Sequence, residues 1–208
     1  FGRDGAWRRE AARMAAPYPC TLALDMATGT GDLALALAER AGRVVGVDIC
    51  PPMLALACHK AGKRGLWGRV SFALGDGLRL PFPDNTFDAA ATAFSLRNVA
   101  DVETALQELH RVLKPEGRLA CLELLPAPHK ALSFLHRLYL GTVVPLLGRA
   151  VTGDLGAYLY LRDSVNNFCD AQGLKGLMER VGFGGVRYRF YYLYSVAIHT
   201  GVKEPSKT

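Results

Sequence analysis

The residues best suited to chemistry lie in and just after the segment from Leu22 to Asp32, which reads LALDMATGTGD. An apolar run is followed by Gly29 and Gly31, and a second apolar run ends at Asp48. Glycine permits a tight turn and a close approach of the backbone to a ligand. Amide groups after such a turn can face a carboxylate or a phosphate, and an acid at the second strand end can accept both hydroxyls of a ribose. The segment therefore predicts a pocket for a nucleoside cofactor.

The turn alone does not identify the cofactor. The pattern Gly29-x-Gly31-x-x-Ala34 suits a dinucleotide enzyme, an S-adenosylmethionine (SAM) enzyme, or a purely structural strand-to-helix connection. Asp76 follows a third apolar run, where it either meets the adenosine or forms a turn. A hydride-transfer enzyme needs room for a second nucleotide, whereas the C-terminal part of this chain predicts a hairpin at a sheet edge. That difference favours SAM.

Alternating helices and strands must position these residues. The predicted helices span residues 8–16, 32–41, 51–63, 102–113, 158–168 and 174–181. The predicted strands span residues 21–26, 43–47, 70–74, 87–94, 118–123, 186–192 and 195–200. Strands that alternate with helices predict an α/β fold, in which a parallel sheet has helices on both faces. The last two strands are expected to form an antiparallel hairpin.

Length and composition predict a single domain over residues 1–208, because half of the residues are hydrophobic. The net charge of +6 permits attraction to an anionic membrane surface, but the basic residues are dispersed, which favours an ordinary solvated surface. No basic cluster is interleaved with aromatic residues, so no nucleic-acid partner is expected. Five cysteines without a CxxC pair predict neither a disulfide framework nor a metal site and favour the cytoplasm.

The longest apolar stretch runs from residue 131 to residue 147. His136 and Arg137 interrupt it, and Pro145 would break a helix there, so it is a poor transmembrane span. It is either a helix packed on the core, or a lid or lipid-contacting surface. We therefore expect residues 126–170 to hold a helical insertion that covers the substrate, in a cytoplasmic protein for which contact with the membrane surface stays open.

Three further segments carry a family resemblance. They read LPFPDNTFD over 80–88, FSLRNV over 94–99 and RVLKP over 111–115. Together with Trp7-Arg8-Arg9, the glycine turn and Tyr158-x-Tyr160-Leu161, they make nearly the whole chain resemble the UbiE/MenG/COQ5 family of class I SAM-dependent methyltransferases. LRNV and YxYL are the motifs most specific to this family, whereas LPF and RVLKP are common to many methyltransferases.

The family C-methylates the ring of ubiquinone and menaquinone precursors. The resemblance therefore implies a Rossmann-like, mostly parallel seven-stranded sheet that ends in the hairpin. It also implies SAM as cofactor and a lipophilic quinol as substrate, and it leaves a homo-oligomer open. Two alternatives remain at this stage: a SAM-dependent O- or N-methyltransferase of another small molecule, and a non-catalytic partner protein with this fold.

The resemblance implies a catalytic pair and a cofactor shell. Arg97 and Asn98 form the catalytic pair, and Arg97 acts electrostatically because a guanidinium is too basic to be a simple general base. The alternative for the pair is a surface arginine and an asparagine that caps the next helix. The cofactor shell that the resemblance implies is Thr30, Asp48, Asp76, Gly77 and Ala93. The glycine turn and the strand ends add Asp25, Thr28, Gly29, Gly31, Ile49 and Met53 to the predicted shell.

Two members of the shell have competing roles that the residues leave open. Asp25 either helps to hold the methionine ammonium or fixes the turn through backbone hydrogen bonds. Met53 packs either on the adenine or in the core. The chain also departs from the family, which usually has glycine at Thr28 and Glu116 and a cofactor-contacting serine at Ala93.

Overall fold

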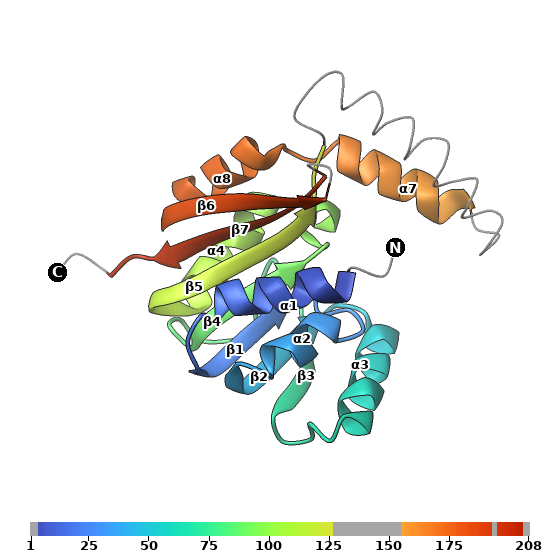
Figure 1. The fold of residues 1–208 in the computed structure, drawn as a ribbon, viewed down its shortest axis with the longest axis vertical. Coiled ribbons are helices and arrows are strands. Elements are labelled where there is room, and N and C mark those ends of the chain that lie inside the picture. Colours follow the sequence, from blue (N-terminus) through green and yellow to red (C-terminus); the bar gives the residue numbers. More distant parts are fainter. Residues whose placement is uncertain (1–3, 127–154, 193–194, 206–208) are drawn as a thin grey trace.

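The computed structural model describes residues 4–126, 155–192 and 195–205, whose strands form one seven-stranded sheet in the order β3-β2-β1-β4-β5-β7-β6 (Figure 1). The pairs among β1 to β5 are parallel, whereas β7 is antiparallel to both β5 and β6. The strands are β1 (Cys20–Met26), β2 (Ala41–Asp48), β3 (Val70–Leu74), β4 (Phe87–Ala93), β5 (Leu113–Leu124), β6 (Phe183–Tyr192) and β7 (Val196–Lys203). This order confirms the predicted Rossmann-like sheet and its antiparallel hairpin.

Helices cover both faces of the sheet, as the alternating pattern predicts. The helices are α1 (Asp4–Ala15), α2 (Asp32–Leu37), α3 (Pro51–Lys63), the short 3-10 helix η1 (Leu96–Asn98), α4 (Val102–Val112), α7 (Leu155–Asn166) and α8 (Ala171–Arg180). Small side chains of α1 and α2 pack in one core cluster with residues of β1, β4 and β5. Side chains of α4 and α8 pack in a second cluster on the other face.

The sequence of α4 shows how one such helix is set. Asp101 precedes it, and the Asp101 carboxylate accepts hydrogen bonds from the backbone amides of Glu103 (3.0 Å) and Thr104 (3.2 Å). These bonds satisfy amides that the helix itself leaves without partners. Leu106 and Leu109 recur at helical spacing and are fully buried against the sheet.

The parallel register brings the functional turns to one edge of the sheet. Met26, the last residue of β1, pairs with Val47 of β2 on one side and Thr92 of β4 on the other. The loops after these three strands therefore meet at the carboxyl edge, where open parallel sheets bind ligands.

The observed ends of some helices and strands differ from the predicted ends, because contacts with other elements determine them. α2 ends at Leu37 instead of residue 41, because β2 already begins at Ala41. β5 begins at Leu113 instead of residue 118 and carries Glu116 at φ +65°.

Two observations concern the predicted helical insertion and the possibility of a membrane-spanning helix. The apolar stretch 131–147 and most of the predicted insertion 126–170 lie outside the described residues. None of the described helices combines the length and apolarity needed to cross a bilayer.

Candidate cofactor site

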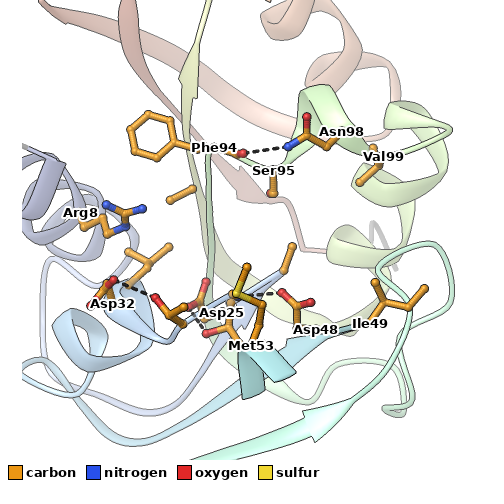
Figure 2. Close-up of a pocket in the computed structure, with 16 residues that line it drawn as sticks. Arg8, Asp25, Asp32, Asp48, Ile49, Met53, Phe94, Ser95, Asn98 and Val99 are labelled. Carbon is orange, nitrogen blue, oxygen red and sulfur yellow. Dashed lines mark hydrogen bonds between the residues drawn. The ribbon is translucent and has the colours of Figure 1, made fainter. Parts of the chain in front are cut away.

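A cleft of about 450 Å³ opens at the carboxyl edge of the sheet, where β1, β2 and β4 end (Figure 2). A smaller hollow of about 270 Å³ adjoins it, and the two share Asp48, Ile49 and Asn98 in their walls. Their volumes lie near or within the range of small-molecule sites. The sequence-predicted residues that line the cleft are Asp25, Thr28, Gly29, Thr30, Asp48, Ile49, Met53, Ala93 and Asn98. Asp76 and Gly77 line the smaller hollow.

The glycine turn after β1 closes the floor of the cleft. Gly31 has φ +83°, and a Cβ there would lie 2.9 Å from the Cβ of Ala57 in α3. A larger residue would therefore force α3 away from the turn, although Gly31 itself does not line the cleft. Gly29 has φ +53° and faces open space, so its role is conformational and its backbone stays accessible.

Asp25 ends up almost completely buried in the floor of the cleft. Its Oδ2 accepts a hydrogen bond of 2.6 Å from the Thr28 hydroxyl, whereas its Oδ1 has no hydrogen-bond partner of ordinary geometry. Burial raises the pKa of Asp25 to about 7, and the Thr28 hydroxyl and the backbone amide of Ala34 offset part of that rise. A buried carboxylate oxygen without a donor is a strong acceptor for a ligand.

Thr28 occupies a position where the family usually has glycine, and the structure shows why the larger residue fits. Its side chain lies against Gly46 of β2, where a Cβ would come within 2.8 Å of the Thr28 hydroxyl. Gly46 thus provides the room that Thr28 needs. The Thr28 hydroxyl donates its hydrogen bond to Asp25 and therefore does not block the cleft.

Asp48 is fixed at the tip of β2 by two backbone amides. Its Oδ2 accepts from Gly29 N at 2.7 Å and its Oδ1 accepts from Cys50 N at 2.9 Å. Each carboxylate oxygen has a second lone pair. The carboxylate is therefore oriented and can still accept hydroxyl groups of a ligand.

Apolar side chains line the mouth of the cleft beside Asp48. Ile49 is 69% exposed and Met53 is 42% exposed, and both line the cleft. The core position that sequence reasoning left open for Met53 is therefore wrong. These two exposed apolar side chains lie beside the Asp48 carboxylate and provide a surface on which a flat base can pack.

The remaining members of the predicted shell lie at the rim. The Thr30 hydroxyl donates to Asp32 at 3.1 Å and accepts from the Lys60 ammonium at 2.7 Å. Asp76 accepts from Leu78 N at 2.9 Å, which makes it the turn-forming residue that sequence reasoning had kept as one of two options. Ala93 lines the cleft at the end of β4 without a side-chain polar group.

Arg97 and Asn98 are neighbours in the chain but separate in the structure. Asn98 lines both hollows, donates to Phe94 O at 3.3 Å and accepts from the Tyr160 hydroxyl at 3.2 Å. Asn98 does not cap α4, because Asp101 does. The capping alternative is therefore wrong.

The Arg97 side chain lines neither hollow and is only 9% exposed. Its guanidinium pairs with the buried carboxylate of Glu123 on β5, and its Nε has no partner. The surface alternative for Arg97 is therefore wrong, and its predicted catalytic role stays a prediction. Burial raises the pKa of Glu123, against the lowering effect of the Arg97 charge.

Seven residues of the cleft were not predicted: Arg8, Ala27, Asp32, Leu33, Phe94, Ser95 and Val99. Arg8 reaches the cleft from α1, and Phe94 and Ser95 line it directly after β4. Arg8 lies in the Trp7-Arg8-Arg9 run that supports the family resemblance, so a signal existed but indicated no role. Phe94 adopts φ +59°, a strained conformation for a bulky residue that often marks a functional site and that sequence does not reveal.

Comparisons with known proteins agree with this geometry. Residues 1–203 match the ubiE/COQ5 methyltransferase family. A demethylmenaquinone methyltransferase of Thermus thermophilus is 49% identical over 203 residues, which cover 97% of this chain and 91% of the relative. The ubiquinone/menaquinone biosynthesis C-methyltransferase UbiE of Teredinibacter turnerae is 40% identical over 200 residues, 95% of this chain and 80% of the relative.

Solved structures share the fold at low identity. A methyltransferase structure from Bacillus halodurans has a TM-score of 0.70 at 17% identity and covers 98% of this chain and all of its own. Phosphoethanolamine N-methyltransferase 2 of Haemonchus contortus, solved with SAM, has a TM-score of 0.71 at 15% identity, covering 96% of this chain and 53% of its own. The family match indicates a SAM-dependent methyltransferase and does not favour the non-quinone and non-catalytic alternatives.

Proposed function

The protein belongs to the ubiE/COQ5 methyltransferase family, and from that premise we propose that it methylates a ring carbon of a reduced prenyl-quinone precursor. A demethylmenaquinol-type naphthoquinol is the favoured acceptor. The Thermus thermophilus relative and one from Deinococcus radiodurans, which is 46% identical over 191 residues, are both demethylmenaquinone methyltransferases. A benzoquinol of the ubiquinone pathway is the second acceptor, because the UbiE relatives match at 40% identity or less.

The cleft fits SAM on an observation that is independent of the family. Asp25 lines the cleft and its buried Oδ1 has no hydrogen-bond partner, so a methionine ammonium would supply the missing donor. Asp48 would accept the ribose hydroxyls, and Ile49 and Met53 would pack on the adenine. Asp76 and Gly77 would border the adenosine end in the smaller hollow.

When bound, SAM supplies a methyl group that its sulfonium has already activated for transfer. The task of the chain is then to align donor and acceptor, and well-oriented reactants gain on the order of 7 kcal/mol or more of barrier reduction. Asn98, Phe94 and Ser95 form the wall of the cleft opposite the glycine turn, and we place the acceptor ring there. The hydrogen bonds of Asn98 to Phe94 O and to the Tyr160 hydroxyl hold this wall together.

Arg97 would act from behind that wall. Its guanidinium lies 6.0 Å from the centre of the Phe94 ring and pairs with Glu123, so it also holds η1, which carries Asn98. A positive charge at this depth favours a phenolate, which carries the electron density that the attacking ring carbon needs. We expect Arg97→Ala, which removes the charge, to lower turnover far more than it lowers the affinity for SAM, measured by steady-state kinetics and calorimetry. Equal turnover would remove this role.

The substrate class places the reaction near a membrane. A prenylated quinol resides in lipid, and the net charge of +6 supports peripheral contact with an anionic surface. We therefore propose a cytoplasmic enzyme that meets its substrate at the membrane surface.

The deciding experiment incubates the purified chain with methyl-labelled SAM and a panel of reduced precursors, and analyses the lipid fraction by mass spectrometry. We expect label on the ring carbon of demethylmenaquinol. The Asp48→Ala variant is the matched control, since it should lose SAM affinity and product together. Tight SAM binding without methylation of any quinol in the panel would overturn the proposal.

A further inference from the structure

More acidic than basic side chains line the cleft. Asp25, Asp32 and Asp48 are acidic, whereas Arg8 is the one basic side chain among the described residues that line it. SAM carries two positive groups, a sulfonium and an ammonium, and one negative group, a carboxylate. Asp25 and Asp48 can meet the ammonium and the ribose hydroxyls, whereas Asp32 is already paired with the Lys60 ammonium at 2.9 Å. Beside the backbone amides of the glycine turn, Arg8 is then the one charged partner for the carboxylate among the described residues that line the cleft.

Arg8 is placed and oriented for that task. Figure 2 shows its guanidinium between Asp32 and the ring of Phe94. The guanidinium carbon lies 5.1 Å from the centre of the Phe94 ring, a distance typical of a cation–π contact. The positive charge of Arg8 offsets a small part of the rise that burial causes in the pKa of Asp25. At Asp32, where burial raises the pKa and Lys60 lowers it, the charge of Arg8 adds to the lowering.

Arg8 keeps donors available for a ligand. Among the described residues, its guanidinium donates from Nη1 to Asp4 Oδ2 at 2.7 Å, and the Asp4 side chain is 60% exposed. A guanidinium has five N–H donors, and exposed pairs within one helix hold their partners weakly. The side chain of Arg8 is 20% exposed, so it is partly removed from water, where a charge-assisted bond is stronger.

We propose that Arg8 binds the carboxylate of the methionine portion of SAM. This inference rests on the proposed placement of SAM in the cleft. The ammonium and the carboxylate are attached to the same carbon atom, so an ammonium at Asp25 brings the carboxylate to the side of the cleft where Arg8 lies. Asp25 and Arg8 then recognise the two ends of one zwitterion, and the cleft selects ligands with an intact amino-acid group.

The test compares SAM with decarboxylated SAM, which keeps the sulfonium and the ammonium but lacks the carboxylate. Calorimetry should show that the wild-type chain binds SAM roughly ten- to one-hundredfold more tightly than the decarboxylated ligand. In Arg8→Gln the two ligands should bind about equally, because only SAM loses a partner. Arg8→Lys should keep part of the preference.

Arg9 supplies the matched control. It is the next residue of α1, is exposed and does not line the cleft, so Arg9→Gln should keep the wild-type preference. A wild-type chain that binds both ligands equally, or an Arg8→Gln variant that keeps the preference, overturns the inference. So does an Arg8→Gln variant that binds SAM normally but methylates demethylmenaquinol slowly, because Arg8 would then serve the acceptor.

Asp48→Asn separates this failure from a failure of the underlying placement. If SAM lies in the cleft, Asp48→Asn weakens both ligands to a similar degree, whatever Arg8 does. If Asp48→Asn and Arg8→Gln both leave both affinities unchanged, the placement of the cofactor is wrong. A thermal unfolding curve of each variant identifies any loss that comes from misfolding.

Discussion

Asp25 combines complete burial, one unpartnered oxygen and a pKa of about 7. Its pKa is raised, so a large share of the carboxyl groups in the free protein hold a proton near neutral pH. An ammonium that arrives beside Oδ1 favours the charged carboxylate and displaces this proton. Ligand binding at this residue is therefore linked to proton release.

We expect the affinity for SAM to rise with pH between about 5.5 and 7, because below the pKa of Asp25 the proton must first leave. Asp25→Asn should bind SAM more weakly and lose this pH dependence. Calorimetry in buffers of different ionisation enthalpy measures the released proton directly. A wild-type affinity that is constant across this range would contradict the assignment of Asp25 to the ammonium.

Glu123 and Arg97 form the most deeply buried ion pair among the described residues. Breaking a buried pair leaves one charge without compensation, at a cost of about 3–5 kcal/mol. We therefore expect Glu123→Gln to lower the free energy of unfolding by about that amount in urea titration. The double variant Arg97→Met with Glu123→Leu should recover most of the loss, because it removes both charges. A double variant less stable than Glu123→Gln would contradict this account.

At the scale of elements, the irregular stretch of β5 between Leu113 and Arg118 carries a conformational cost at one residue. Glu116 is exposed and has φ +65°, a left-handed conformation that costs an L-residue about 1–2 kcal/mol relative to glycine. The family usually has glycine here. The register of β4 with β5 also shifts between Phe87 and Ala89, beside this stretch.

Glu116→Gly should stabilise the protein by about 1 kcal/mol, somewhat less than the full strain because glycine also gains freedom in the unfolded chain. Glu116→Ala keeps a Cβ and should give little or no gain. Urea denaturation of the three proteins measures the difference. Equal stabilisation by alanine and glycine would show that the glutamate side chain, and not its backbone conformation, carries the cost.

Elements were predicted well where local chemistry decides them, and less well where distant contacts do. The alternation of strands and helices around Gly29 and Gly31 follows from apolar runs and turn residues, and the structure confirms it. The early start of β5 depends on pairing with β4 at Leu113, which no local pattern contains.

Within the site, too, some residues could be predicted from the local sequence and others depend on distant contacts. Residues on the glycine turn and the tip of β2 were predicted because each follows a recognisable strand. Arg8 joins the cleft only because α1 packs across α2, and Arg97 is buried only because Glu123 of β5 lies beside it. Contacts between distant segments determine both positions, so residue spacing could not indicate them.

At the scale of the whole molecule, charge and substrate class point to a surface interaction. With a net charge of +6, the protein should bind vesicles that contain anionic lipid, and the bound fraction should fall as salt rises, since charges more than about 8–10 Å apart are screened at physiological ionic strength. Co-flotation with anionic and with neutral vesicles measures this. Equal binding to both vesicle types would contradict an electrostatic contact.

β7 follows β6 in the chain, yet it lies between β5 and β6 in the sheet. During translation, residues 183–192 therefore leave the ribosome with no strand to pair with until residues 196–203 have been synthesised. A stop codon between the two segments would cost the sheet two strands, not one, and would leave β5 as an open edge ready to pair with another chain. Truncated products of this gene should accordingly aggregate and depend on chaperones, although they retain the whole glycine turn.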